Sequence, residues 1–162
     1  MNRHYDSARY REIVGKIRKY FKNPSITTDV MVGFAGEAEE EFQQSLDFCK
    51  EIAFAKAHIF AYSIRKGTRA AKMPNQLTNA VKEQRSHILT DAMEECRRAF
   101  MRSQVGLTEE VLFETDIVRG GYVGYTMNYT PVWVNSEENL CGQVKTVKIT
   151  DCGEQYCIGE LL

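Results

Sequence analysis

The chain has 162 residues, which suits one domain or two small ones, and its 43% hydrophobic and 27% charged residues are typical of a folded globular protein. We find no apolar run long enough to cross a bilayer and no signal-peptide pattern at the start. The composition therefore argues against a disordered chain and a helical membrane protein. It predicts a cytoplasmic protein with no membrane partner.

Charge is distributed unevenly along the chain. Residues 1–103 contain 18 Lys and Arg against 13 Asp and Glu, a net charge of +5, whereas residues 104–162 contain 3 against 9, a net charge of −6. Such a difference suggests two modules with different surfaces. It also argues against assigning nucleic-acid binding to the second half from charge alone.

The cysteines give no sign of a disulfide framework, because their number is odd and nothing indicates secretion. Cys152 and Cys157 form the only close pair. A metal clip is one interpretation, but a coincidence of two strand ends is favoured, because no second Cys or His pair has matching spacing. No CxxC and no three-cysteine iron–sulfur run occurs.

The pattern of residues 1–62 predicts helix, strand, helix, strand. An amphipathic helix capped by Asp6 or Ser7 ends at Asn23-Pro24. Its basic face is either a solvated surface, which we favour, or an RNA contact. Strands are expected at about 26–32 and 55–62. The helix between them, at about 37–52, should bury Phe42, Leu46, Cys49 and Ile52.

Neither predicted strand alternates cleanly between apolar and polar residues, which predicts helices on both faces of their sheet. We therefore expect His58 to be a core histidine rather than a base. Two parallel strands leave both sheet edges unpaired, which is unusual for a complete domain. This half therefore indicates a piece of a larger α/β sheet.

The stretch 28–37, TDVMVGFAGE, joins an apolar β-branched run to an acid-rich helix start through Gly33 and Gly36. This pattern is typical of a βα turn, and in a parallel barrel such turns lie at the carboxyl ends of the strands, where ligands bind. The alternative is that both are plain turn glycines.

A polar loop at 63–77 follows the second strand, and loops of this length are more often functional than decorative. Thr78 then caps a long helix that runs to about Gln104. Beyond Gly106, about five short β-rich runs predict a small closed barrel of the OB type. Trp133, which lies between two valines, is expected in the core of that barrel.

Five motifs occur in order: MNRHY at 1–5, TTDVMVGFAGE at 27–37, HIFAYSIRKGTRAAKMPNQ at 58–76, KEQRSHIL at 82–89 and GYTMNYTPV at 124–132. Together they resemble the tRNA methylthiotransferases, which are radical S-adenosylmethionine (SAM) enzymes. These insert a methylthio group at C2 of a hypermodified adenosine next to the anticodon. The spellings HIFAYSIRKGT and AKMPNQ are closest to the branch that acts on N6-threonylcarbamoyladenosine (t6A).

The resemblance implies a fold that is α/β and then all-β. Residues 1–104 would be the C-terminal part of a radical-SAM (TIM-like) barrel, and residues 105–162 the OB-like TRAM β-barrel. SAM and 4Fe-4S clusters would be cofactors of the parent protein, with none bound to this chain, which lacks the family's CxxxCxxC loop and is expected to be inactive alone. The chain has Ala35 and Ala38 where the family usually has proline and threonine.

The resemblance also implies that the first strand and its elbow line the adenine of SAM. Glu37 either contacts a ligand or only stabilises the first helical turn. Residues that end the second strand would face the same mouth, and Arg65 is the best candidate there for a cofactor or substrate contact. The expected cofactor-binding residues are Val30, Val32, Gly33, Glu37, Tyr62, Ser63 and Arg65, with no catalytic residue or metal ligand.

Candidate RNA contacts fall into two groups. Lys66, Arg69 and Lys72 in the loop would neutralise tRNA phosphates or form a merely solvated surface. On the barrel, aromatic side chains and an arginine would stack unpaired bases. These barrel candidates are Arg119, Tyr122, Tyr125, Asn128 and Tyr129.

The expected partner is tRNA, through its anticodon stem-loop. Two alternatives stay open: a stand-alone RNA-binding TRAM module, and a methylthiotransferase that acts on a ribosomal protein. An incomplete barrel would expose a large apolar surface, so the chain is also expected to self-associate.

Overall fold

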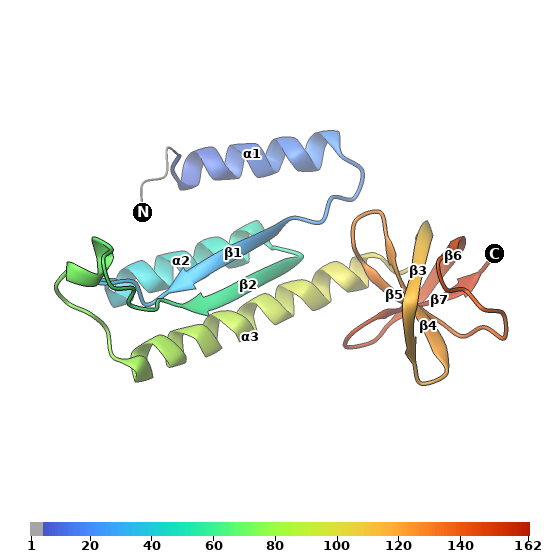
Figure 1. The fold of residues 1–162 in the computed structure, drawn as a ribbon. Coiled ribbons are helices and arrows are strands. Elements are labelled where there is room, and N and C mark those ends of the chain that lie inside the picture. Colours follow the sequence, from blue (N-terminus) through green and yellow to red (C-terminus); the bar gives the residue numbers. More distant parts are fainter. Residues whose placement is uncertain (1–4) are drawn as a thin grey trace. The chain divides into compact units, whose positions relative to one another are not determined.

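The computed structural model describes residues 5–162, so most of the MNRHY motif lies outside the described residues. The chain folds into two compact units, one formed by residues up to 22 and 26–97 and the other by 23–25 and 98–162 (Figure 1). The division falls inside a helix, earlier than the boundary expected near Gln104. The reason is that Met101 packs in the core of the second unit, where Gln104 is also buried.

The first unit is an α/β structure with two parallel strands. Within residues 5–162, no helix is long and apolar enough to cross a membrane. The elements are α1 (Ser7–Tyr20), β1 (Thr27–Val32), α2 (Glu39–Ile52), β2 (Lys56–Ala61), the short 3-10 helix η1 (Ala70–Lys72) and α3 (Asn79–Ser103), most of which belongs to this unit.

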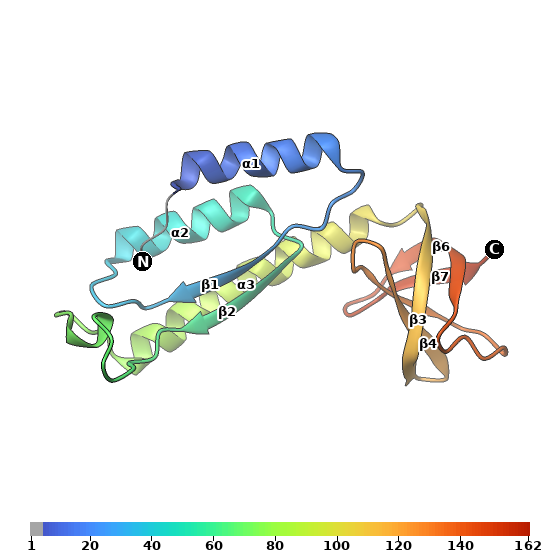
Figure 2. The ribbon, with the colours of Figure 1, turned by 45° about the horizontal axis from the view of Figure 1, so that its top comes forward.

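One face of the β1–β2 sheet carries the core of this unit. The strands pair in parallel with Val30 opposite Ile59, and both side chains pack against the buried cluster. In Figure 2, α3 passes behind the two strands and α2 lies between the strands and α1. The four predicted core residues of α2 are all buried, which confirms that prediction. The cluster also includes Val14 of α1 and Leu89 and Met93 of α3.

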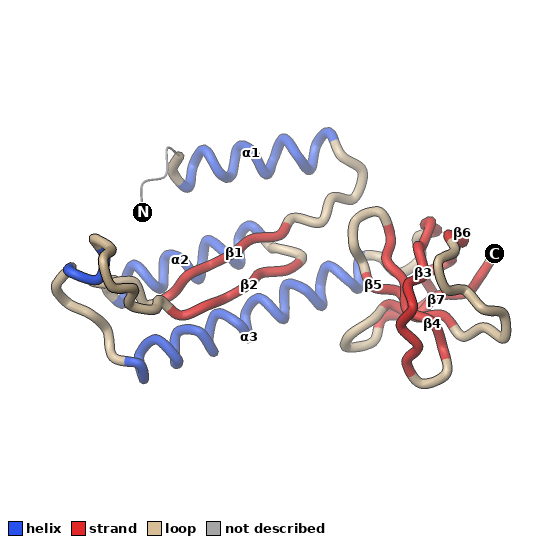
Figure 3. The backbone as a smooth tube through the Cα atoms, in the orientation of Figure 1, coloured by secondary structure: helices blue, strands red, loops and turns tan. Residues whose placement is uncertain are grey.

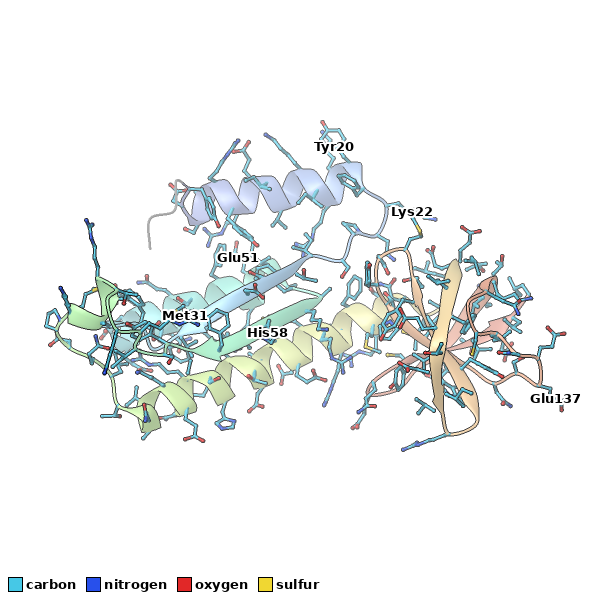
Figure 4. All side chains as sticks on the ribbon, in the orientation of Figure 1. Tyr20, Lys22, Met31, Glu51, His58 and Glu137 are labelled. Atoms are coloured by element: carbon cyan, nitrogen blue, oxygen red, sulfur yellow. The ribbon has the colours of Figure 1, made fainter. Side chains whose placement is uncertain are left out.

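The other face of the sheet carries no helix of the described chain, so the prediction that helices cover both faces is wrong. Exposure alternates along β1, and Asp29 and His58, directly opposite each other, are both exposed. Met31 and His58 are labelled on the strands in Figure 4. His58 is therefore not a core histidine. The face is also not the large apolar surface expected of an incomplete barrel, because polar side chains stand beside Met31 and Phe60.

The basic face of α1 is partly neutralised within its own unit. Arg11 makes two hydrogen bonds of 2.6 and 2.7 Å to the carboxylate of Glu51 in α2. Lys16 lies 2.6 Å from Glu12, one turn away. The helix begins after Asp6, whose side chain accepts from the Arg9 amide at 2.8 Å, as the sequence predicted. These contacts favour a structural surface over an RNA contact on this part of α1.

The second unit is a closed five-stranded barrel, which confirms the predicted OB-type fold. The strand order is β3-β4-β5-β7-β6, and β6 pairs back to β3. Only β5 and β7 run parallel, and Figure 3 shows the strands with their connecting loops. The strands are β3 (Thr108–Val118), β4 (Gly121–Thr126), β5 (Pro131–Val134), β6 (Val144–Cys152) and β7 (Cys157–Leu161).

The start of α2 offers a test of how the sequence shapes this fold. Ala38 is the N-cap and makes no side-chain hydrogen bond, although its amide already donates to Glu41 at 2.8 Å. Ala38→Thr adds the missing hydroxyl acceptor and completes a capping box. We expect the free energy of unfolding, measured by urea denaturation with helical circular dichroism, to rise by about 1 kcal/mol. Ala38→Val has the same shape without the hydroxyl, and an equal gain there would contradict the capping explanation.

Candidate functional site

The carboxyl ends of β1 and β2 meet at the glycine elbow, residues 33–36. Gly33 and Gly36 have φ angles of 72° and 80°, in the left-handed region that favours glycine. A Cβ on Gly33 would lie 2.5 Å from Cγ of Lys82 in α3, so the helix packs directly on the elbow. The amide of Gly36 donates to the carbonyl of Asn75 at 2.9 Å, which ties the loop 63–77 to the same place.

Glu37 fixes this elbow from inside. Its carboxylate accepts from the Gly33 amide at 2.8 Å and from Arg85 at 2.6 Å. A second Arg85 nitrogen donates to Glu39 at 2.8 Å. Since α2 begins at Glu39, the first-turn interpretation of Glu37 is wrong. Its backbone is engaged as well, because its carbonyl accepts from Arg85 at 3.0 Å and its amide donates to the carbonyl of Phe34 at 3.0 Å. Glu37 therefore has a structural role and little capacity left for a ligand.

Arg85 is a site residue that the sequence analysis missed, although it lies within the KEQRSHIL motif. Its side chain is 7% exposed and that of Glu37 is 14% exposed. Burial lowers the pKa of Arg85, but the hydrogen bonds that it donates to Glu37 and Glu39, together with the attraction of their charges, outweigh this effect and raise it. The guanidinium therefore stays charged and serves as the anchor between α3 and the elbow.

The other cofactor candidates have unequal access to a ligand. The side chains of Val30 and Val32 pack in the helix-side core, so mainly their backbone could meet an adenine. Ser63 and Arg65 are exposed at the start of the loop. Tyr62 is buried, and its ring packs edge-on against Phe34 with centroids 5.1 Å apart.

Hydrogen-bonding capacity is left unused around this elbow. In the described chain, three buried side-chain atoms have no hydrogen-bond partner: Oη of Tyr62, Oε1 of Gln76 and Nε of Arg85. All three residues belong to the strand ends, the loop or the facing part of α3. The described residues contain no cluster of three side chains that could hold a metal ion.

The predicted RNA-binding side chains of the loop, Lys66, Arg69 and Lys72, are all exposed. None of them pairs with a carboxylate among residues 5–162, so their charges are available to a partner. Figure 3 shows that this segment is loop apart from the short turn of η1.

On the barrel, an aromatic groove lies on the outer surface. Trp133 points outward between the buried Val132 and Val134, so the prediction that it lies in the core is wrong. Its indole nitrogen donates to the carbonyl of Val118 at 2.8 Å, which holds the ring in place. A groove of about 580 Å³ lies beside the ring. Its lining residues include Arg119, Trp133, Glu154, Tyr156 and Ile158.

The predicted barrel residues divide between this outer surface and the interior. Tyr122 packs against the core, whereas Asn128 is held by hydrogen bonds to neighbouring segments. The Asn128 amide donates to the carbonyl of Asn23 at 2.9 Å and accepts from Thr130 at 2.7 Å. This bonding holds the β4–β5 loop, from which Tyr129 projects with 81% of its surface exposed.

Tyr125 also lies on the outer surface, near the groove. Burial raises the pKa of its hydroxyl, and the neighbouring Glu114 and Tyr156 raise it further. Its ring centroid lies 6.3 Å from that of Tyr129. Trp133 and Tyr156, which the sequence analysis did not select, complete this aromatic surface. Trp133 could have been found by alternation, because a residue between two core valines of one strand must point outward.

Comparison with known families identifies the barrel. Residues 102–162 match the family model of the TRAM domain. The barrel is a TRAM domain. Among solved structures, the apo form of Mycoplasma genitalium RNase R aligns with a TM-score of 0.32 and 13% identity, over 54% of this chain and 20% of that one.

The whole chain, including the TRAM domain, aligns with proteins named tRNA-2-methylthio-N(6)-dimethylallyladenosine synthase. Identity is 37% over all of this chain for the proteins from Clostridium botulinum (strain Hall) and Alkaliphilus oremlandii. It is 39% over 93% of this chain for that from Chloroflexus aurantiacus. The chain covers 33%, 35% and 33% of these relatives, about a third of their length. It is therefore homologous to a segment of these synthases.

The anchor at the elbow can be tested by removing its carboxylate. Glu37→Ala leaves the buried Arg85 guanidinium without its closest partner, so we expect the free energy of unfolding to fall by about 3 kcal/mol in urea denaturation. Glu40→Ala, which removes an exposed carboxylate from the first turn of α2, is the matched control. Equal losses in the two variants would show that the ion pair does not hold the elbow.

Proposed function

We propose that the chain is part of a tRNA methylthiotransferase, in which the TRAM domain binds single-stranded RNA and the α/β unit contributes to the SAM site. The observation that carries the RNA-binding part is the outer groove of Trp133, Tyr156 and Arg119. Homology to tRNA-modifying synthases supports the enzyme class.

The groove lies where OB-type barrels bind oligonucleotides. In such barrels the second and third strands, with the loops between strands one and two and between strands four and five, form the ligand surface. Here those elements are β4, β5 and the loops at 119–120 and 153–156, and the groove is lined from β5 and both loops. Trp133 and Tyr156 are suited to stack on unpaired bases, and Arg119 can contact a phosphate or a base plane.

Charge indicates how the barrel would hold RNA. Residues 98–162 contain 5 Lys and Arg against 9 Asp and Glu, a net charge of −4, and Glu154 stands in the groove itself. Phosphate neutralisation is therefore a poor source of affinity there. Stacking on the aromatic side chains would supply most of the binding energy, which favours splayed, single-stranded bases such as those of a loop.

For the α/β unit, we propose that β1 and β2 are the last two strands of a radical-SAM barrel. The face with Asp29 and His58 would then point into the lumen, covered by the rest of that barrel. When bound and reduced through the parent's 4Fe-4S cluster, SAM supplies the radical chemistry. The backbone of Val30–Gly33 would contact its adenine, and Ser63 and Arg65 would bind polar groups. The unpartnered atoms of Tyr62 and Gln76 fit a polar ligand at this end.

The TRAM proposal is tested with fluorescence anisotropy of a labelled anticodon-loop RNA on the 162-residue chain. We expect Trp133→Ala and Tyr156→Ala each to weaken binding roughly tenfold or more, since a stacked base contributes about 1–3 kcal/mol. Tyr20→Ala removes a 74% exposed aromatic from α1 (labelled in Figure 4) and is the control. Circular dichroism checks the fold, and Trp133→Phe should retain most of the affinity. Equal affinity of wild type and both groove variants would refute the proposal.

The substrate base needs a separate test. The names of the relatives specify dimethylallyladenosine, whereas the motif spellings favour t6A, which we propose. The full-length protein, purified anaerobically with its clusters, should methylthiolate tRNA that carries t6A and leave tRNA with dimethylallyladenosine unchanged, as measured by nucleoside mass spectrometry. The reverse result would assign it to the other branch, and modification of neither tRNA would direct attention to a protein substrate.

A further inference from the structure

Lys82, in the second turn of α3, is a buried lysine without an acidic partner. The residue is 5% exposed, and among residues 5–162 its ammonium group forms no ion pair and no hydrogen bond. Its Nζ lies over the ring of Tyr62, 5.3 Å from the ring centroid. The Nζ atom is not among the buried atoms without a partner in the described chain, so the stem of Lys82 is covered while its ammonium group reaches the surface. The structure thus has a cation whose stem is held by packing and which has no carboxylate partner among the described residues.

Arg85, three residues further along the same helix, is a buried cation whose charge is neutralised by carboxylates. It is 6% exposed, and two carboxylates, those of Glu37 and Glu39, face its guanidinium. Both acids are thereby used by Arg85. Lys82 packs its stem against Gly33 in the same elbow, but no carboxylate of the described residues forms an ion pair with its ammonium group.

A cavity of about 560 Å³ opens beside Lys82. Polar groups line it from the end of β2 and from the first turns of α3, where helix N–H groups add partial positive charge. The lining includes Tyr62, Ser63, Asn79, Lys82 and Ser86. The hydroxyl of Tyr62, a side chain that is 8% exposed, has no partner among the described residues. The acidic lining residue, Glu83, is 75% exposed and lies 3.9 Å from His87.

We propose that this cavity binds a phosphate group, with Lys82 as the central cation. A compact ammonium group binds phosphate as a point charge, whereas planar carboxylates are matched by the fork of an arginine. No arginine is among the described residues that line the cavity, and Arg85 of the same helix already holds Glu37 and Glu39. Hydroxyl and amide donors of Ser63, Ser86 and Asn79 can complete the shell around the phosphate oxygens, as phosphate sites at helix N-termini do.

The site goes beyond the proposed RNA contacts of the TRAM domain, and none of its residues belongs to the barrel. It shares Tyr62 and Ser63 with the proposed SAM contacts, whereas Lys82, Asn79 and Ser86 belong to the cavity alone. Two sources share this chemistry, an RNA phosphodiester and a small phosphorylated molecule. The basic loop begins at Ser63, inside the lining, so an RNA strand bound by that loop could place a phosphate here.

The test is isothermal titration of the 162-residue chain with inorganic phosphate in a low-salt, phosphate-free buffer. We expect wild type to bind, and Lys82→Met to bind at least about tenfold more weakly, because one charge-assisted hydrogen bond is lost. Lys50→Met removes an exposed lysine of α2 outside the cavity and should bind like wild type. No binding by wild type, or equal binding by Lys82→Met, would overturn the proposal.

A second measurement keeps the test informative if Lys82→Met fails to fold. Lysine-selective methylation of wild type, followed by peptide mass spectrometry, should show that phosphate protects Lys82 and leaves Lys50 unprotected. An unprotected Lys82 would overturn the site. Displacement of phosphate by an anticodon-loop RNA would identify an RNA phosphodiester as the natural ligand. If the RNA does not displace phosphate, the natural ligand is a small phosphorylated molecule. Trp133→Ala should leave phosphate binding unchanged, which separates this proposal from RNA binding by the TRAM domain.

Discussion

The buried ion pair between Glu37 and Arg85 is the interaction on which the α/β unit depends. It joins the glycine elbow after β1 to the N-terminal third of α3, across 48 residues of sequence. Because the same carboxylate accepts from the Gly33 amide, the pair sets the backbone at the end of β1 directly. The guanidinium also lies over the ring of Phe42, 5.1 Å from its centroid, and so links the elbow to the core of α2.

This arrangement explains why the strand ends are suited to binding. Arg85, Glu37 and Glu39 neutralise one another's charges at the elbow, so they neither attract nor repel a ligand strongly. What is left for a partner is Lys82, the hydroxyl of Tyr62 and the exposed basic loop. The proposed SAM contacts and the proposed phosphate site both use groups that the fold has positioned but not paired.

The TRAM barrel reaches a binding surface by a different route. Its interior is filled by apolar side chains such as Val111, Phe113 and Ile149, while Trp133 is fixed outside by its hydrogen bond to the carbonyl of Val118. The side chain of Asn128 forms hydrogen bonds that hold the β4–β5 loop, and Tyr129 in that loop is exposed. Since this unit is acidic and residues 1–22 with 26–97 hold 16 Lys and Arg against 13 Asp and Glu, stacking and phosphate contacts are assigned to different units.

Local sequence patterns were enough to predict the order of elements, the buried stripe of α2, the cap at Asp6 and the OB-type barrel. All of these depend on periodicity and turn residues within short stretches. The folded chain was needed to show that one sheet face is uncovered, that Glu37 pairs with Arg85 rather than opening a helix, and that Lys82 has no carboxylate partner among the described residues. It also showed Asn128 bonded to Asn23, and Tyr156 in the same groove as Trp133. These facts depend on contacts between residues far apart in the chain, and no local pattern encodes which distant side chain will meet which.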